Sequence, residues 1–141
     1  MTSMAQLGVL LAGRGTVAGD RVRDALAGAG LTMRSAFTLT HLADGPVNQQ
    51  ALIDLLGVDP SALVAVLNEL ESLGLVSRQR DPADRRRHIV KLTGEGAATL
   101  RTVETVLDKT DDDLFAALST AERGQLERLL TKVTGSCGDD H

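Results

Sequence analysis

The spacing of apolar residues along the chain predicts a mainly helical protein. Leucine, valine and alanine recur three and four residues apart in successive segments, which is the period of one helix face. This spacing covers residues 31–43, 49–56 and about 60–73, and it returns in the last third of the chain. One short stretch, residues 75–80, alternates instead with a period of two and is predicted to be a strand.

Two of the predicted helices are short and carry clear signals at their ends. Asn48 is a favourable N-cap for the helix over 49–56, and Gly57 suits the position that closes it. Asp59 is a second N-cap, and Pro60 follows at the first helical position, where its missing N–H costs no hydrogen bond. Two short helices joined by a tight turn predict a helix-turn-helix motif.

A basic hairpin follows the second of these helices. The strand over 75–80 leads into a turn over 81–87, and residues 88–92 return as the second strand. The hairpin carries five arginines, which are Arg78, Arg80, Arg85, Arg86 and Arg87. This order of elements predicts a winged helix, in which the second helix enters the major groove of DNA and the wing contacts the backbone or the minor groove.

The segments on either side of this motif are also predicted to be helical. Six glycines in residues 1–30 each cost a continuous helix about 1 kcal/mol relative to alanine, so we expect a short or broken helix there. Beyond Thr93, near-heptad apolar spacing runs through Leu100, Val103, Leu107, Leu114 and Leu118. A small domain offers so long a helix little to pack against, which favours a partner subunit over the chain's own core as its cover. A capping box over 119–122 starts the final helix.

Composition narrows the class of protein. With 141 residues and a mass of 14.9 kDa, the chain suits one compact domain with helical extensions. Its longest apolar run, residues 7–12, is too short to span a bilayer or to form a signal core, so we expect a cytoplasmic protein. The net charge is −4, yet residues 78–91 hold six basic and two acidic side chains. A basic patch on an acidic body indicates a focused contact with a polyanion.

Three stretches around the predicted wing form a specific combination. Residues 70–78 read LESLGLVSR, residues 81–86 read DPADRR, and residues 90–96 read VKLTGEG. This combination resembles the MarR family of winged-helix transcriptional regulators. The resemblance implies a homodimer that is clasped by its N- and C-terminal helices and bound to a pseudo-palindromic operator in double-stranded DNA. It also implies that Arg86 enters the minor groove, that Asp84 braces the wing, and that many such proteins release DNA when a small molecule or an oxidant binds.

The predicted recognition helix departs from this family. Residues 59–73 contain no Lys or Arg, so a basic side chain of this helix cannot read guanine. Hydrogen bonds from Ser61 and Asn68 and methyl contacts with thymine remain, and we expect weak direct readout. Much of the affinity is then expected from the wing and from helix N-termini near phosphates. The predicted DNA contacts are Asn48, Gln49, Ser61, Ala62, Val64, Ala65, Asn68, Arg78, Arg80, Asp84, Arg85, Arg86 and Arg87.

Other kinds of site find less support. An effector pocket between the helices is expected to be lined by Leu11, Phe37, His41 and Leu107, although Phe37 by itself fits plain core better. Cys137 is expected to be a free surface thiol, and the scattered histidines and the acidic run over 111–113 predict no metal site. The early glycines match no nucleotide-binding motif, so no cofactor is predicted. No set of residues suggests catalysis, so an enzyme is not expected.

Together these patterns predict a mainly α fold with a small β-hairpin wing. We expect an N-terminal helical dimerisation segment over 1–30, a winged helix-turn-helix over 31–93, C-terminal dimerisation helices over 94–134 and a flexible tail over 135–141. The predicted function is a homodimeric, sequence-specific transcriptional regulator, with a repressor preferred and a small-molecule effector as a further partner. The alternative is a winged-helix module that binds proteins or ligands and has no specific DNA site. The intact arginine wing favours the regulator.

Overall fold

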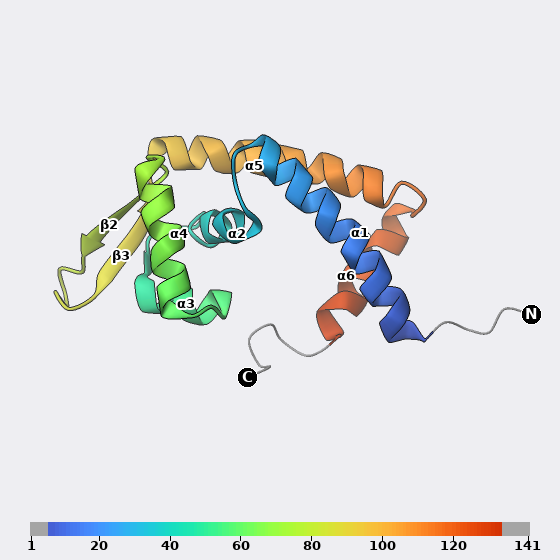
Figure 1. The fold of residues 1–141 in the computed structure, drawn as a ribbon, viewed down its shortest axis with the longest axis horizontal. Helices are drawn as coiled ribbons and strands as arrows, with labels where there is room; N and C mark the ends of the chain where they lie inside the picture. The colour runs from blue at the N-terminus through green and yellow to red at the C-terminus, as the bar shows by residue number, and fades with distance from the viewer. Residues whose placement is uncertain (1–5, 134–141) are drawn as a thin grey trace, which may run out of the picture.

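The computed structural model describes residues 6–133, which form six helices and three short strands (Figure 1). The elements are α1 (Leu7–Gly28), α2 (Met33–His41), β1 (Val47–Asn48), α3 (Gln49–Leu56), α4 (Pro60–Ser72), β2 (Val76–Arg80), β3 (His88–Leu92), α5 (Gly94–Leu114) and α6 (Thr120–Lys132). A lobe made of α2, α3, α4 and the sheet lies at one end of α5, and α1 and α6 extend toward the other end. The predicted mainly helical winged-helix class is confirmed.

The helix-turn-helix forms as its end signals predict. The side-chain oxygen of Asn48 accepts hydrogen bonds from the backbone N–H groups of Gln50 at 2.8 Å and Ala51 at 3.4 Å. Gly57 ends α3 with a φ of 63°, in the left-handed region. Helices α3 and α4 are bent by 113° relative to each other, as in DNA-binding helix pairs. Among residues 6–133, no single helix is long and apolar enough to cross a membrane. This bent pair meets the same criterion of length and composition only when its two helices are counted together.

The wing belongs to a three-stranded antiparallel sheet in the order β1-β3-β2. Strands β2 and β3 pair along their whole length, with Arg78 opposite Val90 and Arg80 opposite His88. Strand β1, which the alternating pattern did not predict, pairs Val47 with Val90. Because β1 leads directly into α3, this pairing fixes the wing relative to the helix-turn-helix.

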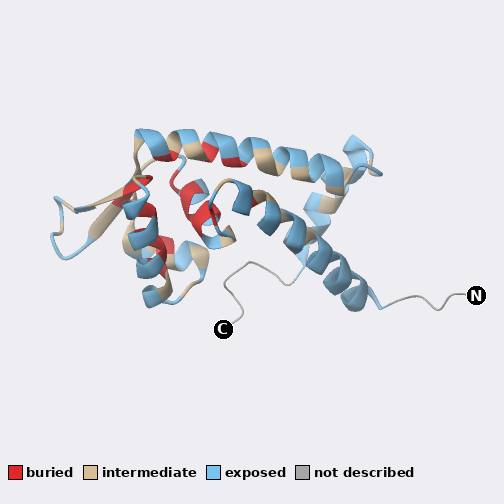
Figure 2. Ribbon diagram, turned by 45° about the horizontal axis from the view of Figure 1, so that its top comes forward, coloured by how far each residue is buried: buried red, intermediate tan, exposed pale blue. Residues whose placement is uncertain are grey.

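The core lies where α2, α4, the sheet and the first half of α5 meet (Figure 2). Leu63, Leu67 and Leu70 of α4 are fully buried, as their three- and four-residue spacing predicts. Val90 of β3 and Val103 of α5 are fully buried as well. This packing uses one face of α4 and leaves its opposite face in solvent.

Helix α5 packs against its own chain, so the preference for a partner subunit as the cover of its apolar stripe was wrong. Leu100 and Val103 are buried in the core, and Leu107 is partly buried against it. Helix α1 runs back beside α5, and α2 contacts α5 from the winged-helix lobe. The apolar residues of the first half of α5 are therefore covered by α1 and α2 of the same chain.

Helix α1 is continuous from Leu7 to Gly28, so the prediction of a short or broken helix was also wrong. Helix propensity is a weak constraint that packing can outweigh. Here the fully buried Leu26 and the packing on α5 anchor the C-terminal part of the helix. The N-terminal part has no buried residue among those that the structure describes, and Leu10 and Leu11 are exposed there.

Helix α6 starts at the predicted capping box. The Ser119 hydroxyl oxygen accepts from the Glu122 N–H at 3.1 Å, and the Glu122 carboxylate accepts from the Ser119 N–H at 2.9 Å. None of the residues of α6 is buried, and Leu129 and Leu130 are exposed. The predicted tail over 135–141, with Cys137, lies outside the described residues.

The start of α5 is pressed against the turn between α4 and β2. Thr93 caps the helix, because its hydroxyl oxygen accepts from the Gly96 N–H at 3.0 Å while the hydroxyl donates to the Gly74 carbonyl at 2.6 Å. Gly96 is buried, and a Cβ at this position would collide with the backbone carbonyl of Leu75. Only glycine therefore allows α5 to approach the winged-helix lobe this closely.

Candidate nucleic-acid interface

The outer face of α4 carries most of the predicted base-reading residues. Ser61, Val64, Ala65 and Asn68 are exposed, whereas Ala62 is only partly exposed. Glu69, which was not among the predicted contacts, is exposed on the same helix. Its negative charge is the feature of the sequence that could have indicated it, because a carboxylate repels the phosphates of DNA.

The N-terminus of α4 differs in one detail from its prediction. Asp59 occupies the N-cap position, but its side chain makes no hydrogen bond to the helix backbone. Instead, the hydroxyl of Ser61 donates to the Asp59 carboxylate at 2.7 Å. Because its proton is engaged there, Ser61 offers its oxygen lone pairs to a base.

Arg78 reaches from β2 back to α4. Its Nε donates to Oε1 of Glu71 at 2.7 Å, and its Nη2 donates to Oδ1 of Asn68 at 2.6 Å. The side chains of Arg78 and Glu71 are 23% and 34% exposed, so this ion pair is partly shielded from water. Arg78 stays a predicted DNA contact, but in this structure it acts on the surface of α4 through Asn68.

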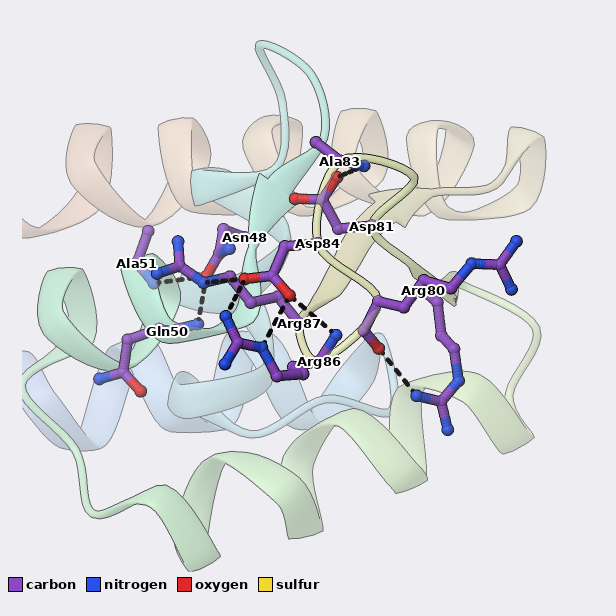
Figure 3. A network of polar contacts seen from close by, with 10 residues as sticks. Asn48, Gln50, Ala51, Arg80, Asp81, Ala83, Asp84, Arg86 and Arg87 are labelled. Atoms are coloured by element: carbon purple, nitrogen blue, oxygen red, sulfur yellow. Dashed lines mark hydrogen bonds and ion pairs between the residues drawn. The ribbon is translucent and has the colours of Figure 1, made fainter.

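Two aspartates hold the turn of the wing (Figure 3). The Asp81 carboxylate accepts from the backbone N–H of Ala83 at 2.8 Å. The Asp84 carboxylate accepts from the backbone N–H and from the Nε of Arg86, both at 3.1 Å, and lies 3.5 Å from the Nε of Arg87. Such side-chain bonds to the local backbone fix the conformation of a turn.

The surroundings of Asp84 favour its ionised form. Hydrogen bonds from the side chain and the backbone of Arg86 hold the pKa of the Asp84 carboxyl below its ordinary value. Burial opposes these two hydrogen bonds to a smaller extent, and the positive charge of Arg87, the smallest of these effects, again lowers the pKa. The carboxylate therefore keeps its hold on Arg86 through neutral and mildly acidic pH, as a brace of the wing requires.

Arginine side chains project from this braced turn into solvent. Arg85, Arg86 and Arg87 are exposed, and the side chain of Arg86 is 90% accessible. Arg80 is exposed as well and donates from Nη1 to the backbone carbonyl of Arg85 at 2.8 Å. The structure thus concentrates positive charge at the end of the wing.

A polar cavity of about 350 Å³ lies between the wing and the start of α3. It brings the predicted contacts Asn48 and Gln49 together with Arg86 and Arg87. The N-terminus of a helix carries a partial positive charge, which adds here to the charges of the two arginines. This arrangement suits an anion such as a backbone phosphate.

Among residues 6–133, the predicted effector residues line neither the polar cavity beside the wing nor a second cavity at the start of α5. Phe37 is 46% exposed, so its interpretation as plain core was wrong, because the buried residues of α2 lie on the opposite face of that helix. Leu11 and His41 are exposed, and Leu107 is partly buried. None of the four lines the cavity of about 460 Å³ between the α1–α2 turn, the end of α4 and the start of α5. Within residues 6–133, no group of three His, Cys, Asp or Glu side chains is placed to hold a metal ion.

Comparisons with known proteins decide the family. The sequence profile of the MarR family matches residues 29–87. Over 104 residues the chain is 34% identical to the transcriptional regulator HosA of Escherichia coli O111:H-, a match that covers 73% of this chain and 77% of HosA. This chain belongs to the MarR family. The family resemblance found in the sequence motifs is confirmed.

Further relatives extend the comparison. A Thauera aromatica protein named as a transcriptional regulatory protein for the hcr operon is 40% identical over 96 residues, which are 67% of this chain and 58% of that protein. A mutant MarR from Escherichia coli in complex with operator DNA is 28% identical, with a TM-score of 0.79 over 91% of this chain and 93% of its own. CouR from Rhodococcus jostii RHA1, bound to p-coumaroyl-CoA, is 30% identical, with a TM-score of 0.79 over 93% of this chain and 95% of CouR.

Proposed function

We propose that this MarR-family protein is a homodimeric, sequence-specific transcriptional repressor that binds a pseudo-palindromic operator in the cytoplasm. The observation that carries the proposal is the exposed arginine tip of the wing beside the uncovered outer face of α4. The solved complex of a mutant MarR with operator DNA supports this use of the fold. Residues 31–93 would contact DNA, and the helices within 1–30 and 94–134 would hold the dimer together.

The two surfaces would contribute differently to binding. The wing arginines and the N-terminus of α3 supply the positive charge that a phosphate backbone attracts. Helix α4 supplies exposed small and polar groups, among them Ser61, Ala65 and Asn68, that fit base edges in the major groove. Affinity then comes mainly from the wing, and sequence preference comes mainly from α4.

The second subunit is proposed to cover the apolar side chains of α1 and α6. Leu7 is 79% exposed, and Leu10, Leu11, Leu129 and Leu130 are exposed as well. Large apolar side chains gathered in solvent mark an interaction surface. A two-fold axis through this end of the molecule would place two winged-helix lobes on half-sites about 10 base pairs apart, or a multiple of this spacing.

A small organic ligand is proposed as the effector, because CouR of the same fold is solved with p-coumaroyl-CoA. The exposed Phe37 and His41 of α2 and Leu11 of α1 would line its site once the second subunit is in place. The test is a screen of acyl thioesters and aromatic acids for release of a bound operator. A ligand that binds here should lose its effect in a Phe37→Ala protein that still binds the operator.

The regulator itself is tested by selecting genomic fragments with the purified protein at near-physiological salt and with excess random DNA. Recovery of an inverted repeat, enriched again when the protein is tested on it alone, supports the proposal. Binding that random DNA competes away would contradict it and would favour the winged-helix module without a specific DNA site.

A further inference from the structure

The most versatile polar side chain on the outer face of α4 already has a partner. An unrestrained asparagine both accepts and donates, so it can read adenine through two hydrogen bonds. Asn68 shares its helix face with Ser61 and Ala65, since these positions follow each other by four and three residues. Its Oδ1, however, accepts a hydrogen bond from Nη2 of Arg78 at 2.6 Å.

The nature of this partner fixes which end of the amide faces outward. A guanidinium only donates hydrogen bonds, so the atom of Asn68 that faces Arg78 is its oxygen. The amide nitrogen of Asn68 then points away from Arg78, and it donates to no other residue in 6–133. Asn68 therefore turns its two amide donors toward the solvent, while Arg78 occupies one of the two lone pairs of Oδ1.

Arg78 is itself held in place. Its Nε donates to Oε1 of Glu71 at 2.7 Å, and its backbone lies in β2 opposite the fully buried Val90. Glu71 and Asn68 are three residues apart on α4, so one guanidinium spans both. Hydrogen bonds in such a chain polarise one another, and the charge of Arg78 on Oδ1 strengthens the donors of Asn68.

We propose that Arg78 is a positioning residue that turns the amide donors of Asn68 outward, and that Asn68 thereby selects against cytosine at the operator position that it reads. In the major groove, guanine offers the acceptors N7 and O6, adenine offers N7 and thymine offers O4, whereas cytosine offers only a donor. Every base except cytosine can therefore accept a hydrogen bond from the outward-facing amide of Asn68. This inference rests on the proposed function and assigns a specificity to the same surface.

The test is selection of bound operators from a pool that is randomised over each half-site. Asn68→Asp keeps an oxygen toward Arg78 and replaces the donor by an acceptor. We expect it to lower the preference for guanine and thymine at one symmetric pair of positions and to favour cytosine and adenine, whose amino groups donate. Asn68→Ala should flatten the preference there by about tenfold in relative affinity. Arg78→Ala frees the amide to turn its oxygen outward, so cytosine should become acceptable at the same positions.

Arg80→Ala is the matched control for Arg78→Ala. Arg80 carries the same charge, lies two residues along the same strand and makes no contact with Asn68. Its loss should weaken binding to all sequences alike and leave the preference unchanged. Asn68 is exposed, so its two variants should melt with the wild type and test the donor role even if Arg78→Ala fails to fold.

Three outcomes would overturn the inference in different ways. If both Asn68 variants keep the wild-type preference at every position, Asn68 reads no base, although specific binding stands. If the Asn68 variants change the preference and a folded Arg78→Ala protein does not, Arg78 does not position the amide. If the wild type selects no sequence at all, the proposed function itself fails, which is a separate and earlier result.

Discussion

Gly96 is the position where the structure predicts a sharp response to one methyl group. A Cβ there would collide with the Leu75 carbonyl and would lie 3.2 Å from Cδ2 of Leu92. The leucine can move, but the Leu75 carbonyl is held because it accepts from the Thr93 N–H at 3.0 Å. Overpacking costs about 1–3 kcal/mol or more, and replacing a helical glycine by alanine offsets up to about 1 kcal/mol of this. We expect Gly96→Ala to lower the free energy of unfolding by about 2 kcal/mol.

Thermal unfolding followed by circular dichroism measures this loss. At a fixed protein concentration, about 2 kcal/mol lowers the Tm of a domain of this size by roughly 6–8 °C. Gly94→Ala is the matched control, because it lies two residues earlier in α5 and its Cβ would meet no atom within 4 Å. It should stay within about 2 °C of the wild type. A Gly96→Ala protein that melts with the Gly94→Ala protein would refute the close approach of α5 to Leu75.

Three further predictions concern the wing and the uncovered helices. Arg86→Ala should weaken operator binding at least about tenfold and should reduce by about one the slope of log affinity against log salt concentration. Arg101→Ala on α5 should change neither quantity. Fluorescence anisotropy at several salt concentrations measures both. Asp84→Asn should weaken binding by the same factor at pH 8 and pH 5. The reason is that the lowered pKa of Asp84 keeps the carboxylate ionised over this range, and its support of the wing is lost only as the pH falls through that lowered pKa; a factor that vanishes at pH 5 contradicts this assignment. Leu10→Glu should give monomers in light scattering. Leu55 is also exposed but lies on α3, so Leu55→Glu should leave the dimer intact. A Leu10→Glu protein that remains dimeric would place the interface elsewhere.

The helix-turn-helix and the wing could be predicted from the sequence because their signals are local. Asn48, Gly57 and Pro60 act on their own helix ends, and they need no knowledge of the rest of the fold. The hairpin follows from alternation and from a turn rich in aspartate and arginine. Strand β1 escaped notice because two residues are too short to show a period.

The placement of the long helices could not be predicted in the same way. An apolar stripe shows that a helix is covered, but it does not show which surface covers it. Leu100 and Val103 lie under α1 and α2 of the same chain, whereas Leu10 and Leu129 lie in solvent, and both pairs have the same hydrophobic character. The glycines of α1 misled for a related reason, because helix propensity is a weak constraint that the packing of α1 on α5 and α2 can outweigh.

Within the candidate interface, the residue types could be read from the sequence but their partners could not. Arg78 was placed with the wing because of its charge, yet its guanidinium lies on α4. That contact depends on the strand register, which brings position 78 beside the last turns of α4. A contact between residues ten positions apart, on a helix and a strand, has no periodic signature in the sequence.

The charges of α4 explain why the proposed complex would separate affinity from specificity. Residues 59–73 hold Asp59, Glu69 and Glu71 and no Lys or Arg, and of these carboxylates only Glu71 is paired with a cation. Any DNA would attract the wing by its phosphates and would repel the carboxylates of α4, whatever its sequence. Contacts of α4 with base edges must therefore supply the difference between specific and non-specific binding. The same repulsion lowers the absolute affinity, so a modest change in the spacing of the two lobes would suffice to release the operator.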